Sequence, residues 1–132
     1  MDPKYILGIA ELDSQHEEIE KLFFSLQLAI EDKDHWHNVQ EVLERLCEKL
    51  KYHFYAEETI MDVFAYPETQ EHGRSHLGIL KALEGFKSKT LTEYDIEQLR
   101  TYPMQLFFEQ IINQDMRFAA FLQKNRERLG IQ

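Results

Sequence analysis

The stretch from His53 to His76 reads HFYAEETIMDVFAYPETQEHGRSH and contains two pairs of ionisable side chains at helical spacing. His53 and Glu57 are four residues apart, and so are His72 and His76. In an α-helix, residues at i and i+4 lie on the same face, one turn apart. Between the two pairs, Pro67 disfavours helix at the residue before it. The stretch therefore predicts two helices joined by a turn, each with two potential metal ligands on one face.

Apolar residues recur at helical spacing on both sides of this stretch, and the pattern extends to four helices. The first predicted helix begins after Asp13 or Ser14. The four predicted helices cover about residues 14–30, 38–64, 68–87 and 93–125. No segment alternates with a period of two, so no sheet is expected. Short connections favour an all-α, antiparallel up-down-up-down four-helix bundle. We predict one domain over residues 1–132.

The fourth predicted helix carries three boundary signals. Thr92 is the expected N-cap, and Gly130 lies where a C-cap is expected. Pro103 removes one backbone hydrogen bond, so it should kink the helix or split off a short lead-in helix.

Composition excludes several classes of partner. The formal charge is -9, with 24 acidic against 15 basic residues, and no basic cluster is present. Nucleic acid and anionic membrane surfaces are therefore unexpected partners. Cys47 is the only cysteine, no signal peptide is apparent, and no apolar run could span a membrane. These features predict a cytoplasmic protein.

The histidines carry the chemical signal. Four of the six lie on predicted helices, whereas His35 and His37 lie in the first predicted loop, where solvation is the simplest expectation. Asp115 on the fourth helix is flanked by apolar positions that we expect in the core: Ile111, Ile112, Phe118 and Ala119. A buried carboxylate needs a partner, because burying an unpaired charge is costly.

A single histidine on a helix is more often a core or surface residue than a ligand. Candidates on all four helices are harder to explain that way. Ligands projecting inward from facing helices form metal sites in four-helix bundles, and carboxylates can bridge two ions. The predicted metal ligands are His16, His53, Glu57, His72, His76 and Asp115.

At these residues the sequence resembles the hemerythrin family, in particular its bacterial branch. The resemblance rests on the His53–His76 stretch, on GIAELDSQH from Gly8 to His16, and on IINQD from Ile111 to Asp115. It covers nearly the whole chain. It implies a four-helix bundle with a non-haem di-iron centre that binds dioxygen reversibly.

The resemblance also implies a role for each ligand. Each iron would receive two histidines: His72 and His76 for the first iron, His16 and His53 for the second. The two ions would be bridged by Glu57 and Asp115 together with an oxo or hydroxo group. Dioxygen would bind at the second iron, whose coordination is incomplete.

One family ligand is replaced in this chain. Gln110 stands five residues before Asp115, where the family has a fifth histidine that ligates the first iron. An amide oxygen is a weaker, neutral donor. Three outcomes stay open: weak ligation by Gln110, ligation through a water molecule, or an open position on this iron.

Three functional hypotheses follow. The first is reversible oxygen binding for storage, delivery or sensing, in a dry pocket lined by Phe23, Phe54, Phe107 and Ile111. The second is peroxidase-like, oxidase-like or nitric-oxide chemistry at a centre that Gln110 leaves under-ligated. The third is an interaction module with a degraded metal site, which six retained ligands argue against. We favour an oxygen-binding protein over an enzyme, and the sequence identifies no protein partner.

Overall fold

The computed structural model describes residues 1–32, 37–87 and 90–129, without the side chains of residues 128 and 129. His35 and Gly130 lie outside the described residues. Within these ranges every regular element is helical, which confirms the predicted all-α class. The elements are the 3-10 helix η1 (Pro3–Tyr5), α1 (Ala10–Glu31), α2 (His37–Val63), α3 (Thr69–Lys87), α4 (Glu93–Gln110), the π-helix η3 (Ile111–Asp115) and α5 (Met116–Leu129).

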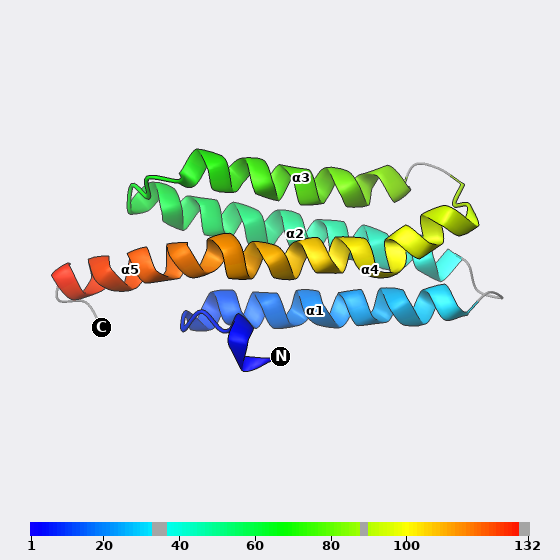
Figure 1. The fold of residues 1–132 in the computed structure, drawn as a ribbon, viewed down its shortest axis with the longest axis horizontal. Helices are drawn as coiled ribbons and strands as arrows, with labels where there is room; N and C mark the ends of the chain where they lie inside the picture. The colour runs from blue at the N-terminus through cyan, green and yellow to red at the C-terminus, as the bar shows by residue number, and fades with distance from the viewer. Residues whose placement is uncertain (33–36, 88–89, 130–132) are drawn as a thin grey trace.

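Four rods make up the bundle. α4, η3 and α5 follow one another without a break and form the fourth rod (Figure 1). The chain reverses direction between successive rods, and the main contacts join α1 to α2, α2 to α3, α3 to α4, and α4 back to α1. This closed ring of neighbours is the predicted up-down-up-down four-helix bundle. None of the described helices is long and apolar enough to cross a bilayer.

The core consists of two apolar clusters. The larger one runs along most of the bundle and includes Leu26, Leu43 and Leu50. The smaller one contains Leu12, Met61, Tyr66, Phe118 and Leu122. Several candidate ligands stand in sequence between residues of the two clusters: His16 lies between Leu12 and Ile19, and Asp115 lies between Ile111 and Phe118. The ligands thus form a polar layer with apolar packing on both sides, which excludes water from it.

α1 begins at Ala10, earlier than the predicted start after Asp13 or Ser14. The reason is that the Asp13 carboxylate does not cap this helix. It instead accepts hydrogen bonds from the backbone N–H groups of Leu7 (2.8 Å) and Gly8 (3.0 Å). Gly8 has a φ of 86°, a region that favours glycine. Asp13 therefore fixes the N-terminal arm on α1.

The fourth rod begins as predicted. Thr92 caps α4 in a capping box, in which the Thr92 hydroxyl accepts from the Asp95 N–H and the Asp95 carboxylate accepts from the Thr92 N–H. Pro103 lies inside α4, and no separate lead-in helix forms. The first turns of α4 are nevertheless inclined to the rest of the rod (Figure 1), as a proline inside a helix would produce.

Candidate metal centre

All six predicted ligands meet inside the bundle, and none has more than 1% of its surface exposed. They form two groups of four: His16, His53, Glu57 and Asp115 in one group, and Glu57, His72, His76 and Asp115 in the other. Within each group one donor atom per residue lies within 4.8 Å of every other. Glu57 and Asp115 belong to both groups. The i,i+4 pairs on α2 and α3 therefore face each other, as their spacing predicted.

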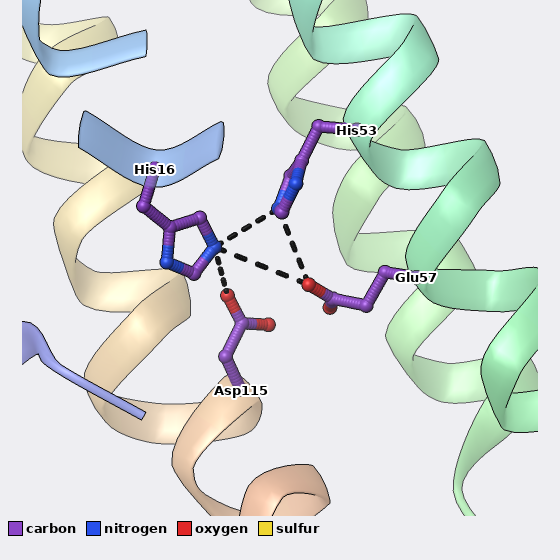
Figure 2. Close-up of side chains that lie close together, drawn as sticks. All are labelled: His16, His53, Glu57 and Asp115. Atoms are coloured by element: carbon purple, nitrogen blue, oxygen red, sulfur yellow. Dashed lines mark hydrogen bonds and ion pairs between the residues drawn. The ribbon is translucent and has the colours of Figure 1, made fainter. Parts of the chain in front are cut away.

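The first group joins three rods (Figure 2). His16 from α1 and His53 from α2 place their Nε2 atoms 2.9 Å apart. The His16 Nε2 atom lies 3.4 Å from Asp115 Oδ2, and the His53 Nε2 atom lies 3.2 Å from Glu57 Oε2. Two imidazole nitrogens and two carboxylate oxygens thus converge on one point.

The second group brings α3 to the same carboxylates. His72 Nε2 lies 2.6 Å from Asp115 Oδ1 and 2.7 Å from Glu57 Oε1. His76 Nε2 lies 3.4 Å from Glu57 Oε1. Here too, two imidazole nitrogens and two carboxylate oxygens converge.

The two oxygens of each carboxylate divide between the groups. Oε2 of Glu57 faces His53, and Oε1 faces His72 and His76. Oδ2 of Asp115 faces His16, and Oδ1 faces His72. A carboxylate that offers one oxygen to each of two donor groups is arranged to bridge two cations.

A π-helical turn places Asp115 in the centre. In η3 the N–H of Met116 donates to the carbonyl of Ile111, five residues earlier. Such turns hold one residue more than an α-helical turn and are frequent at functional sites. The extra residue also changes which side chains face inward: Ile112, predicted in the core, is 45% exposed, so that prediction was wrong. Ile111 and Phe118 are fully buried, as expected.

Gln110 is the last residue of α4, directly before this π-helical turn. Its side chain is 6% exposed, and its Nε2 atom is buried without a hydrogen-bond partner. Because one π-helical turn separates residues five apart, Gln110 and Asp115 lie on similar faces of the rod. The structure thus places Gln110 in the interior of the bundle, directly before the turn that carries Asp115.

Aromatic rings pack against the ligands on both sides. The ring of Phe107 meets His16 edge-on, with centroids 5.5 Å apart. The ring of Phe54 stacks on His76, with centroids 3.9 Å apart and planes 9° apart. Phe23 packs against Phe107 in turn. These rings hold the imidazoles in place and form the apolar surroundings predicted from the sequence.

Two histidines have their outer nitrogen fixed by a neighbour. The Nδ1–H of His53 donates to Gln15 Oε1 at 2.6 Å, and that of His76 donates to Glu58 Oε2 at 3.0 Å. A neutral imidazole that donates from Nδ1 has a bare lone pair at Nε2, the form that binds metals. Gln15 and Glu58 are not among the site residues predicted from the sequence. Their positions directly before His16 and after Glu57 are the only signal that could have identified them.

Burial and the carboxylates set the protonation of the centre. Burial lowers the pKa of His53. Burial also lowers the pKa of His72, but hydrogen bonds to Asp115 and Glu57 outweigh it and raise the pKa to about 9. For Glu57, burial raises the pKa, yet the close imidazoles of His53, His72 and His76 hold it well below its ordinary value. Glu57 is therefore a buried carboxylate anion.

The donor atoms fit a pair of cations. Both oxygens of Glu57 and the Nε2 atom of His76 are buried without a well-directed hydrogen bond. The bare nitrogen of His76 faces a carboxylate oxygen at 3.4 Å, so two lone pairs oppose each other. A cation between them turns this repulsion into two bonds. Imidazole and carboxylate together suit iron, zinc and manganese.

A four-helix bundle with this buried donor set defines a helical cation-binding protein. Residues 7–126 match the family model described as the hemerythrin HHE cation binding domain. The match covers most of the chain, and the chain belongs to this family.

The chain is also similar to bacteriohemerythrins of Pseudomonas aeruginosa. It is 27% identical to those of strains PAO1 and LESB58 over 109 residues, which is 82% of this chain and 71% of each relative. No solved structure matches the chain significantly.

Proposed function

We propose that this chain is a non-haem di-iron protein that binds dioxygen reversibly. His16 and His53 would hold one iron, His72 and His76 the other, and Glu57 and Asp115 would bridge them. The observation that carries this proposal is the division of both carboxylates between the two donor groups. A site for a single ion has no need of two carboxylates that each face two pairs of histidines.

The number of donors leaves room for a small ligand. Each group offers two imidazoles and two carboxylate oxygens, which is four protein donors. An iron ion in such a site commonly takes more than four ligands, so an oxo or hydroxo bridge and dioxygen can complete the set. Ferrous iron held by these residues would supply the electrons for reversible binding of dioxygen.

The surrounding residues suit binding without turnover. Phe107 against His16 and Phe54 against His76 close the sides of the centre, and the two apolar clusters close its ends. Water and protons reach bound dioxygen slowly in such a site, which favours its release unchanged. The relatives named bacteriohemerythrin agree with this proposal. Storage, delivery and sensing all need this binding step, and the single cysteine suits a cytoplasmic setting.

The test is metal analysis combined with an optical titration. We expect the protein loaded with ferrous iron under argon to hold two irons per chain. Exposure to dioxygen should produce a new visible absorption, and return to argon should remove it over several cycles. One iron per chain would refute the binuclear site. Two irons with irreversible oxidation on first exposure, and turnover of added peroxide, would favour the redox alternative.

A further inference from the structure

Glu58 crosses from α2 to α3 to reach a candidate ligand. Its Oε2 atom accepts the hydrogen bond from His76 Nδ1, while its side chain remains 38% exposed. Gly73 on α3 makes this crossing possible. A Cβ atom at position 73 would lie 2.9 Å from Glu58 Oε1, which is too close for a real contact. The absence of a side chain at Gly73 thus leaves the space that the carboxylate occupies.

The two halves of the centre differ in this outer contact. His53 in the first group donates to the neutral amide of Gln15, whereas His76 in the second group donates to a carboxylate. The half of the centre built by His72 and His76 therefore has the charged outer acceptor.

We propose that Glu58 is a positioning residue for the iron that His72 and His76 would hold. It fixes the tautomer of His76 with the bare Nε2 directed at the metal, and it makes this imidazole a stronger donor. The part of this inference that concerns iron rests on the function proposed above. The part that concerns the tautomer of His76 applies to the metal-free chain alone.

The physical basis is the effect of an outer acceptor on an imidazole. A carboxylate at Nδ1 stabilises positive charge on the ring and raises its basicity, and loss of such partners typically costs about 10- to 100-fold in metal affinity. Phe54 stacks on one face of the His76 ring, so rotation of this ring about its Cβ–Cγ bond is already restricted. Glu58 then selects which nitrogen carries the proton.

Solvent limits the size of the electrostatic effect. Glu58, Gly73 and His76 border a surface groove of about 510 Å³ between α2 and α3. Water in this groove screens the Glu58 charge, so we expect a moderate change of reduction potential rather than loss of the centre. The negative charge stabilises the ferric state, and its removal should therefore raise the potential.

The first experiment measures the tautomer of His76 by nitrogen-15 NMR of the metal-free protein. We expect an Nδ1–H tautomer in wild type and in Glu58→Gln, which keeps an acceptor oxygen. Glu58→Ala should lose this preference. Gly73→Ala should weaken it, because the Glu58 carboxylate must shift away from the new methyl group. An Nε2–H tautomer in wild type, or an unchanged tautomer in Glu58→Ala, would overturn the proposal.

Gly73→Ala needs a matched control, since alanine favours helix at any interior position. Gly78→Ala on the same helix supplies it, because a Cβ atom at position 78 meets nothing within 4 Å. Both variants should melt above wild type, and only Gly73→Ala should alter His76. Glu48→Ala, at an exposed position of α2, controls for loss of a carboxylate.

The second experiment uses the iron-loaded protein. Under chelator challenge, Glu58→Ala should bind one iron about 10- to 100-fold more weakly than wild type, with a smaller loss in Glu58→Gln. Both variants should show a raised reduction potential, whereas Gly78→Ala and Glu48→Ala should match wild type. Equal iron retention and equal potentials in wild type and Glu58→Ala would overturn the role toward iron. If wild type itself holds fewer than two irons, the proposed function fails, and the tautomer result still decides the positioning of His76.

Discussion

His72 Nε2 lies 2.6 Å from Asp115 Oδ1, a contact that joins α3 to the π-helical turn η3. Both side chains are buried, and Glu57 Oε1 approaches the same nitrogen at 2.7 Å. A buried imidazole between two carboxylates is stabilised in its protonated form. This contact therefore makes the stability of the metal-free protein depend on pH.

The first prediction concerns that dependence. The pKa of His72 is raised to about 9, above its ordinary value near 6.5, so proton binding stabilises the folded chain. This contribution is complete below about pH 6.5 and is lost as the pH rises through about 9. We expect the urea midpoint of the metal-free protein to fall between pH 7 and 9.5, and to fall less in His72→Gln. Equal slopes in the two proteins would contradict the assignment.

The second prediction tests the bridging role of Glu57. Glu57→Gln keeps the shape of the side chain but replaces one carboxylate oxygen with an amide nitrogen, which does not ligate. We expect fewer than two irons per chain after loading, with helix content by circular dichroism unchanged. Glu48→Gln, at an exposed position of the same helix, should keep two irons. Full iron content in Glu57→Gln would show that the carboxylate does not bridge.

The third prediction concerns the capping box of α4. Thr92→Ala removes the hydroxyl that accepts from the Asp95 N–H at 3.1 Å. Loss of such a cap typically costs about 1 kcal/mol in the free energy of unfolding. Iron content should not change, because residues 92 and 111 are roughly 28 Å apart along the helix at about 1.5 Å per residue. Thr90→Ala, before the helix, is the matched control, and a urea titration of both variants measures the difference.

The six candidate ligands come together in the structure, and most of them follow the α-helical spacing seen in the sequence. His53 and Glu57, like His72 and His76, are four residues apart, and a straight helix must bring each pair to one face. Burial of the apolar stripes then turns these faces inward. Amphipathic periodicity was enough for this part of the centre.

The π-helical turn could not be predicted in this way. In an α-helix, residues five apart differ by about 140° around the axis, so Gln110 and Asp115 would face in different directions. In the structure, the hydrogen bond from Met116 N–H to the Ile111 carbonyl adds one residue to the turn. Gln110 and Asp115 therefore lie on similar faces, and Ile112 lies on the surface. The start of α1 was missed for a related reason: the Asp13 side chain has two possible uses, and only the folded N-terminal arm selects between them.

The fourth prediction concerns Gln110, which the π-helical turn carries to the interior. Its amide nitrogen is buried without a partner, so the site already encloses a polar group of nearly the size of an imidazole. If the resemblance holds, Gln110→His would supply the iron between His72 and His76 with a stronger, basic donor. We expect both proteins to hold close to two irons, and the oxygenated form of Gln110→His to autoxidise more slowly than that of wild type.

The control for this variant is Gln105→His, which places a histidine on the exposed side of α4. It should autoxidise at the wild-type rate. If Gln110→His also matches wild type, the amide at this position has no influence on the irons. A slower rate in Gln110→His alone would show that the neutral amide limits the lifetime of the oxygenated protein. The residue at position 110 would then determine whether the oxygenated protein lasts long enough to carry dioxygen or instead reports or consumes it.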